Sequence, residues 1–167
     1  MKVIVEKINE NAKIPVKAHD EDFCYDVFAT SCEEVEPGIW KYGLGLRFEI
    51  CRAPIYFDIL GVPLGGNRLH DLISDAVVKL SIDFRPRSSV WKTGMILSNC
   101  EGTIDELYRG EVFAYFYEVV PGKEKYKVGD RIGQIKLGIT LPMTFEEGKV
   151  NMNTERGEGG FGSTGLN

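Results

Sequence analysis

The sequence lacks several features that mark common functional classes. It has 20 lysine and arginine residues against 25 aspartate and glutamate residues, a net charge of -5, so no overall positive field can hold duplex DNA or an anionic membrane. No apolar run approaches the length of a membrane span, and the N-terminus lacks the basic, apolar and small-residue order of a secretion signal. We therefore expect a soluble, cytoplasmic protein that binds neither nucleic acid nor membranes.

Metal-ligating and nucleophilic residues are also scarce. The 4 cysteines, Cys24, Cys32, Cys51 and Cys100, are widely spaced without a Cys-x-x-Cys pair, and only 2 histidines are present, so a zinc site is not expected. A disulfide framework does not fit a reducing compartment. No Walker-type phosphate loop is present, and no Gly-x-Gly-x-x-Gly follows a convincing strand. Any phosphate group must therefore be bound by another local arrangement.

Period-two hydrophobic patterning is the main structural signal. In residues 44–51, leucine, phenylalanine and isoleucine alternate with glycine, charged residues and cysteine, as in a half-buried strand. Residues 77–84, 111–120 and 132–139 behave similarly, and the second of these is apolar on both faces, which indicates an enclosed strand or one at a subunit contact. Turn signals stand at 36–38, 121–123 and 128–130. The pattern predicts an all-β, jelly-roll-like β-barrel in one domain.

Two segments depart from the strand pattern. Residues 67–78 carry apolar side chains at three- and four-residue steps, which predicts one short helix, and residues 52–66 are an irregular excursion with two prolines and a Gly-Gly pair. The C-terminal residues 156–167 combine glycines with one arginine, one phenylalanine and two hydroxyl residues. Such a tail buries little apolar area and should stay mobile until a ligand orders it. Its amides, hydroxyls and guanidinium suit an anion, and its aromatic ring suits a planar base.

Five short segments hold polar residues that a purely structural β-domain does not need. Singly, each has an ordinary explanation, such as a turn cap, a surface ion pair or a core tyrosine. The segments are Cys24-Tyr25-Asp26-Val27, Arg85-Pro86-Arg87-Ser88-Ser89, residues 99–110 with Asp105 and Tyr108, Gly129-Asp130-Arg131-Ile132-Gly133-Gln134, and the glycine-rich tail. Their joint presence in this order is the informative observation.

In these five segments the chain resembles the trimeric deoxyuridine triphosphatases (dUTPases), whose five motifs occur in the same order over essentially the whole chain. The third and fifth motifs match almost letter for letter. The resemblance implies a dUTPase-like domain at 1–150 with an insertion at about 52–78, and a flexible C-terminal arm at 151–167 that closes over the active site. It also implies hydrolysis of dUTP to dUMP and pyrophosphate, which keeps uracil out of DNA and supplies dUMP for dTTP synthesis.

The resemblance assigns roles in the chemistry to several residues. Asp105 is then the general base for the water that attacks the α-phosphorus. A Mg²⁺ ion chelated by the phosphates neutralises charge, and Asp26 holds it through bound water, which suits an ion that keeps its hydration shell. Ser88 then contacts the phosphate bridge that becomes the leaving group. Arg87 and Gln134 supply further donors to the triphosphate or to its carboxylate neighbours. The neighbouring Ser89 belongs to the same substrate-binding segment.

The resemblance also implies how the nucleoside is recognised. Uracil lies against the third-motif backbone and the following strand, and Tyr108 stacks under the deoxyribose and excludes a 2′-hydroxyl. Three sites lie between the subunits of a homotrimer, so a monomer should be inactive. The remaining implied substrate contacts are Asn99, Gly102, Thr103, Ile104 and Phe113 around the base, with Phe161 covering it, and Arg156, Gly162, Ser163 and Thr164 in the arm that closes over the γ-phosphate.

One departure keeps alternatives open. The family's second motif usually ends Pro-Arg-Ser-Gly, whereas Ser89 stands in the glycine position here. Arg-Ser-Ser is similar to the dCTP deaminases of the same fold, so a dCTP deaminase or a bifunctional deaminase/dUTPase is the alternative enzyme. A nucleotide-sensing interaction protein that binds dUTP without turnover is a third hypothesis. Asp105 and Tyr108 in the third motif favour the hydrolase.

Overall fold

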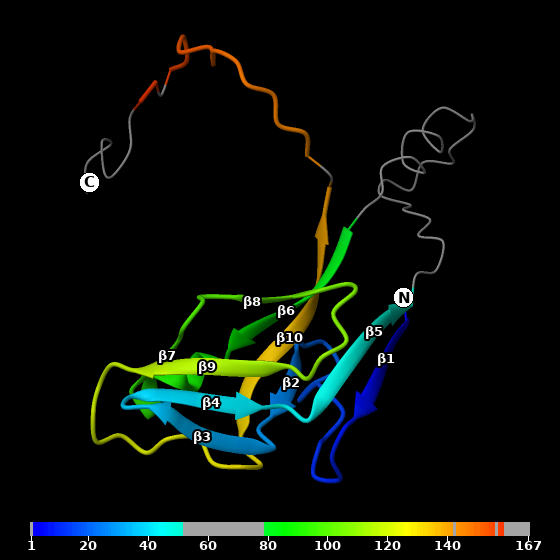
Figure 1. Cartoon of the computed structure of the whole chain (residues 1–167), viewed down its shortest axis with the longest axis vertical. Coiled ribbons are helices and arrows are strands. Elements are labelled where there is room, and N and C mark those ends of the chain that lie inside the picture. Colours follow the sequence, from blue (N-terminus) through cyan, green and yellow to red (C-terminus); the bar gives the residue numbers. More distant parts are fainter. Residues whose placement is uncertain (1, 52–78, 142, 156, 159–167) are drawn as a thin grey trace.

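Strands dominate the computed structural model, which describes residues 2–51, 79–141, 143–155 and 157–158. They form two four-stranded sheets and one two-stranded sheet (Figure 1). The first four-stranded sheet has the order β2 (Tyr25–Phe28), β10 (Arg131–Thr140), β6 (Lys79–Pro86), β8 (Gly102–Asp105). The second has the order β3 (Ser31–Glu36), β4 (Ile39–Gly43), β9 (Phe113–Glu118), β7 (Met95–Leu97). The two-stranded sheet pairs β1 (Lys2–Lys7) with β5 (Leu46–Cys51). The all-β, jelly-roll-like prediction is confirmed, although the described sheets do not close into a continuous barrel.

The strands predicted from alternation are present with shifted ends. In β5 the predicted alternation holds, because Leu46, Phe48 and Ile50 are buried while Glu49 is exposed. In β9, Ala114 and Phe116 point inward, while Phe113, Tyr115 and Tyr117 lie on an outer face that is exposed in the single chain. The predicted turns are confirmed by positive φ angles of 77°, 80° and 93° at the glycines of 36–38, 121–123 and 128–130.

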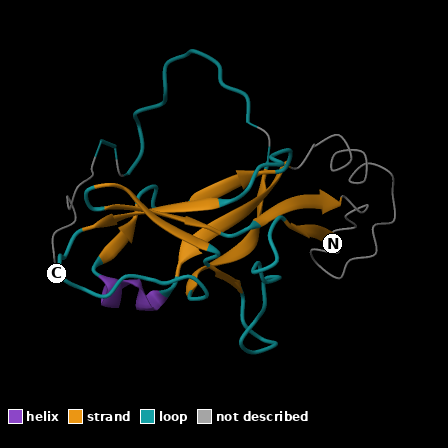
Figure 2. Cartoon of the chain, turned by 60° about the horizontal axis from the view of Figure 1, so that its bottom comes forward, coloured by secondary structure: helices purple, strands orange, loops and turns teal. Residues whose placement is uncertain are grey.

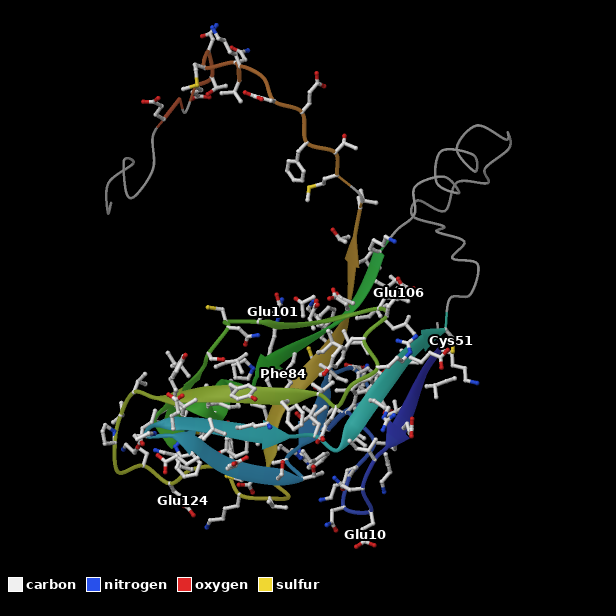
Figure 3. The ribbon with its side chains drawn as sticks, viewed as in Figure 1. Glu10, Cys51, Phe84, Glu101, Glu106 and Glu124 are labelled. Atoms are coloured by element: carbon white, nitrogen blue, oxygen red, sulfur yellow. The ribbon has the colours of Figure 1, made fainter. Side chains whose placement is uncertain are left out.

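The hydrophobic core lies between the two four-stranded sheets. Tyr42 of β4 and Phe116 of β9 have no exposed surface, and their rings meet edge to face at 5.6 Å. Phe84 of β6 belongs to the same buried cluster and lies in the interior of the molecule (Figure 3). Close packing of large rings from both sheets holds the sheets in one orientation.

The described helical structure is one short 3₁₀ helix, η1 (Ser88–Thr93), beside the sheets (Figure 2). It was not expected from the sequence, and the predicted helix at 67–78 lies outside the described residues, as does the whole proposed insertion at 52–78. In the described part of the chain, no helix combines the length and apolar character that crossing a membrane requires. Residues 143–155 are exposed without regular structure and extend away from the sheets (Figure 1).

Candidate active site

The strand order of the first sheet brings four of the five motifs onto neighbouring strands. Asp26 of β2 lies opposite Gln134 of β10, and Gln134 lies opposite Arg85 of β6. These three residues therefore form a row across the sheet on one face, because directly paired residues point to the same side. Strand β8, which carries the start of the third motif, pairs with the other edge of β6. Residues more than 100 positions apart in the sequence are neighbours here.

An aspartate held by two arginines stands at one end of this row, on the edge strand β2. Asp26 is 7% exposed, and its Oδ1 lies 3.3 Å from Arg87 Nε while its Oδ2 accepts a hydrogen bond of 3.1 Å from Arg131 Nη1. Two guanidinium groups face one carboxylate, so the cluster keeps a net positive charge. Both guanidiniums are partly exposed and can also reach an anion from solvent. This arrangement suits a phosphate group.

Arg131 was not among the residues singled out for the site, although it stands inside the fourth motif. In the sequence, Arg131 stands directly before Ile132, which is buried in β10. Alone, an arginine at a strand start is usually a solvated surface residue. Only the antiparallel pairing of β10 with β2, which brings Arg131 opposite Phe28, shows that its guanidinium reaches Asp26.

The second motif forms the entry to η1. Arg87 precedes the 3₁₀ turn in an extended conformation, and Val90 N–H donates to the Arg87 carbonyl at 3.0 Å. Ser88 is exposed and Ser89 is half-buried at the first two positions of the turn. Thr93 Oγ1 donates to the Val90 carbonyl at 2.6 Å and holds the other end. The second motif thus places Ser88 and Ser89 directly after Arg87, whose side chain belongs to the Asp26–Arg87–Arg131 cluster.

A buried ion pair follows along the same face of the sheet. Asp83 of β6 lies opposite Lys136 of β10, and its Oδ2 accepts a 2.5 Å hydrogen bond from Lys136 Nζ while Ser81 Oγ donates to Oδ1 at 2.8 Å. Burial raises the pKa of Asp83, but the hydrogen bonds from Lys136 and Ser81 outweigh it, so that the net pKa lies below the usual value. Glu101, beside β8 in Figure 3, pairs with Arg85 at 2.5 Å.

The third motif is a tight turn that presents its carboxylate to solvent. Tyr108 N–H donates to the Asp105 carbonyl at 3.0 Å, and Arg109 Nη1 donates to the Glu106 carbonyl at 2.8 Å. Tyr108 Oη donates to the Glu111 carbonyl at 3.0 Å, which fixes the ring, and a side chain at Gly110 would collide with that ring. Asp105 is exposed at the end of β8, in a position open to a water molecule.

The residues assigned to uracil recognition lie along β8 and β9. Gly102 and Ile104 are half-buried and Thr103 is exposed on β8. Asn99 is exposed in the turn before β8, and its Nδ2 lies 3.6 Å from the place of a Cβ at Gly102. Phe113 starts β9 with 39% of its surface exposed, and Lys41 Nζ lies 4.2 Å from its ring centroid.

Within one chain, the structure does not bring Asp105 to the arginine cluster. Asp105 lies opposite Ser81, while the β6 end that leads to Arg87 pairs with Gly133 and Gln134. Six residues of extended strand separate Ser81 from Arg87, which corresponds to about 20 Å. The fifth-motif residues Arg156, Phe161, Gly162, Ser163 and Thr164 lie outside the described residues. The described chain thus holds two separate parts of a site.

The described side chains do not form a cage of protein ligands for a metal ion. No group of three histidine, cysteine, aspartate or glutamate side chains among the described residues is arranged to hold one. Asp26 has both oxygens engaged by arginines. A Mg²⁺ ion that takes its inner ligands from phosphates and water, with Asp26 in contact only through water, is compatible with this arrangement, whereas a cage of protein ligands is not.

Comparisons with known proteins agree with this geometry. The family model of the dUTPases matches residues 80–165, which include the second to fifth motifs. The chain belongs to the dUTPase family. The deoxyuridine 5'-triphosphate nucleotidohydrolase of Clostridium novyi is 34% identical over 99% of this chain and 100% of its own length, and that of Clostridium acetobutylicum is 31% identical over 97% and 95%. The dCTP deaminase alternative is therefore not favoured.

Solved structures of dUTPases share the fold. A mutant dUTPase of Staphylococcus bacteriophage 80alpha with dUpNHpp is 19% identical and superposes with a TM-score of 0.68 over 99% of both chains. A mutant dUTPase of the Staphylococcus aureus phage phi11, described with a structural Mg(II) ion, is 18% identical with a TM-score of 0.56 over 90% of this chain and 97% of its own. At this identity the likeness concerns the fold of the dUTPase family.

Proposed function

We propose that this member of the dUTPase family hydrolyses dUTP to dUMP and pyrophosphate by in-line attack of water on the α-phosphorus, at sites shared between three copies of the chain. We infer that the site is shared between chains because Asp105 is far from the Asp26–Arg87–Arg131 cluster within one chain. A reacting phosphorus needs the attacking water and the phosphate-binding groups within a few ångströms of it. About 20 Å of strand lies between them in one chain, so a second copy must supply one of the two parts.

Asp105 is the general base in this proposal. Its carboxylate is exposed at the end of β8, and the turn that follows is held by hydrogen bonds from Tyr108 N–H and the Arg109 side chain to the Asp105 and Glu106 carbonyls. A carboxylate is a weak base toward water, so its contribution comes mainly from holding the water in line with the leaving group. Tyr108, fixed by its bond to the Glu111 carbonyl, is the platform for the deoxyribose.

The arginine cluster is the phosphate-binding part. The net positive charge of Arg87 and Arg131 around Asp26 attracts the triphosphate, and the exposed Ser88 hydroxyl donates to the bridging oxygen that takes up charge as the bond breaks. Gln134, half-buried beside Asp26, supplies an additional donor. A phosphate-chelated Mg²⁺, when bound, would neutralise charge on the phosphates, with Asp26 in outer-sphere contact.

The C-terminal arm is the proposed contribution of a third copy. The segment that leads into the arm carries apolar side chains that its own sheets do not cover: Met143 is 73% exposed, Phe145 90% and Val150 78%. An arm of this kind gains free energy by packing on another surface. Its packing on a neighbouring copy would bring the fifth motif to a site between the other two chains.

Substrate and residue roles are tested together by product analysis. The purified protein is incubated with Mg²⁺ and dUTP, dCTP, dTTP or UTP, and pyrophosphate and ammonia are measured. We expect pyrophosphate from dUTP alone, and a loss of about 10²–10⁴-fold in kcat for Asp105→Asn. Glu124→Gln, which neutralises an exposed carboxylate paired with Lys127, is the control and should retain full activity. Ammonia from dCTP, or an active Asp105→Asn protein, would contradict the assignment.

The shared site is tested by complementation. The Asp105→Asn and Ser88→Ala proteins are each expected to have low activity. For the test, the two proteins are mixed, unfolded together, refolded as a mixture and assayed for dUTP hydrolysis. If each site takes Asp105 from one chain and Ser88 from another, about a quarter of the sites in randomly mixed trimers contain both intact groups. Recovery of activity in the mixture supports the proposal, and a mixture no more active than its components contradicts it.

A further inference from the structure

A cross-strand ion pair stands where the third motif begins, and the function proposed above gives it no role. Arg85 Nε and Glu101 Oε1 lie 2.5 Å apart. Arg85 begins the second motif, and Glu101 lies inside the third, between Asn99 and Gly102. The two side chains are 48% and 38% exposed, and an ion pair at the surface contributes little to stability. The informative feature of this pair is therefore its position in the fold.

The pair continues the connection between β6 and β8 beyond the end of their ladder. The ladder ends with Phe84 opposite Gly102, and Arg85 and Glu101 are the next residues on the two strands. Lys136 Nζ of the neighbouring strand β10 lies 4.0 Å from the same Glu101 oxygen. Two cations on two strands therefore attract the Glu101 carboxylate toward the sheet.

Glu101 also ends a backbone turn that is strained. Among the described residues other than glycine, only Cys100 has a positive φ, at 55°, and Glu101 N–H donates to the Asn99 carbonyl across it. A three-residue turn with a positive φ at its centre is rare, and it persists only where surrounding contacts enforce it. Ser98 N–H donates to the Tyr115 carbonyl at 2.9 Å before the turn, and the Glu101 ion pair holds the other end.

The same turn carries groups that the proposed function assigns to uracil. Asn99 Nδ2 lies 3.6 Å from the place of a Cβ at Gly102, so the amide folds over the start of β8. Hydrogen bonds to a planar base weaken steeply when a donor is displaced or misaligned. A change in the turn would therefore affect the base, whereas Asp105, at the far end of β8, remains paired with β6 through the ladder.

We propose that Glu101 is a positioning residue for uracil recognition. Its ion pair with Arg85, supported by Lys136, holds the turn before β8 in its strained conformation. The turn then presents the Asn99 amide and the Gly102 backbone to the base. Glu101 itself does not touch the substrate, and its effect is on binding of the base, with the phosphates and the attacking water left unaffected. This inference rests on the function proposed above.

Steady-state kinetics with dUTP, Mg²⁺ and two inhibitors test this role. Deoxyuridine carries the base and sugar without phosphates, whereas pyrophosphate carries phosphates without a base. The values of kcat, KM and both inhibition constants are measured for the parent, Glu101→Gln, Arg85→Gln and the double variant. We expect Glu101→Gln to raise KM and the deoxyuridine inhibition constant about fivefold, with kcat and the pyrophosphate inhibition constant changed by less than about twofold.

The second acid–base contact predicts an asymmetry within the pair. Arg85→Gln should raise KM by only about two- to threefold, because Lys136 remains near Glu101. The double variant should match Glu101→Gln, since the pair is already broken there. Arg85→Lys keeps the charge that faces Glu101 and should retain the parental KM.

Another cross-strand pair provides the matched control. Glu6 lies opposite Arg47 on β1 and β5, with Glu6 Oε2 3.6 Å from Arg47 Nε and both side chains partly exposed. Glu6→Gln makes the same chemical change away from the five motifs, and it should retain the parental KM and inhibition constants. All variants should unfold within about 2 °C of the parent, because exposed ion pairs contribute little to stability.

The outcomes separate this inference from the function on which it rests. Unchanged KM and deoxyuridine inhibition in Glu101→Gln overturn the positioning role and leave dUTP hydrolysis intact. Effects that multiply in the double variant also overturn it, because the two residues then act independently. A pyrophosphate inhibition constant raised as much as that of deoxyuridine does the same, because the change then reaches the phosphate-binding part. A parent without dUTP hydrolysis overturns both proposals.

Discussion

Asp83 and Lys136 form a buried ion pair, and we expect replacement of the lysine to cost more stability than replacement of the aspartate. Their side chains are 11% and 17% exposed and lie on directly opposed positions of β6 and β10. Lys136 has a second acid, Glu101, at 4.0 Å, whereas Asp83 has only the Ser81 hydroxyl as its other described hydrogen-bond partner. Removing the lysine therefore leaves a buried carboxylate that is poorly compensated, while removing the aspartate leaves a lysine with a nearby acid.

These contacts set the expected magnitudes. Lys136→Met should lower the free energy of unfolding by about 3–5 kcal/mol, the usual cost of leaving one member of a buried pair unmatched. Asp83→Asn should cost about 1–3 kcal/mol, because its amide can still accept from Ser81 and Lys136. For a chain of this size, the first change corresponds to a fall of about 6–20 °C in the unfolding midpoint.

The pH dependence has a definite sign. The pKa of Asp83 in the folded protein is below its ordinary value, whereas the unfolded chain should titrate near the reference value of about 4. The pair therefore stabilises the fold fully above pH ~4, and this contribution is lost as the pH falls through the lower folded pKa. The acid limb of stability should be flatter in Asp83→Asn, where the group no longer titrates.

Urea and thermal unfolding of the parent and the two variants measure these effects. All samples need the same protomer concentration, because association adds to the apparent stability. Lys127→Met, which breaks the exposed pair with Glu124, is the control and should leave the midpoint unchanged. An Asp83→Asn protein destabilised as much as Lys136→Met, or a Lys136→Met protein that unfolds at the parental midpoint, would contradict the expected asymmetry of the pair.

Three further changes test the site and its support. Asp26→Asn should raise the Mg²⁺ concentration for half-maximal activity by about 10–100-fold in a metal titration, and an unchanged requirement would exclude its outer-sphere role. Gly94→Ala should cost about 1–3 kcal/mol in urea unfolding, because φ is 67° and a Cβ would collide with the Val120 carbonyl oxygen. Phe116→Ala should cost about 3–5 kcal/mol in the same assay, since the ring is fully buried, and a loss below 1 kcal/mol would contradict the core assignment.

Local patterns in the sequence predict much of the fold correctly. Alternation over Leu46–Cys51 is a direct consequence of one buried face, so it is legible without a structure. In β10 the alternation is less regular, because Ile132 and Gly133 are both buried and Ile139 is exposed. The 3₁₀ turn at Ser88–Thr93 was not predicted, because it is short, has no side-chain cap at Arg87 and shows no apolar stripe. Its conformation depends on contacts with Lys125 and Gly94, which no local pattern reveals.

The chemical groups of the candidate site can likewise be read from motif order, because Asp105, Arg87, Ser88 and Gln134 stand in segments with unusual polar content. Their arrangement in space depends on strand pairing between distant parts of the chain. The pairing of β10 with β2 and β6 brings Arg131 and Arg87 to Asp26, and the register of β8 places Asp105 at the other end of the sheet. Residue type and local periodicity are properties of short segments, whereas strand register and burial arise from non-local packing. For this reason, only the folded chain shows that the site is divided into two parts.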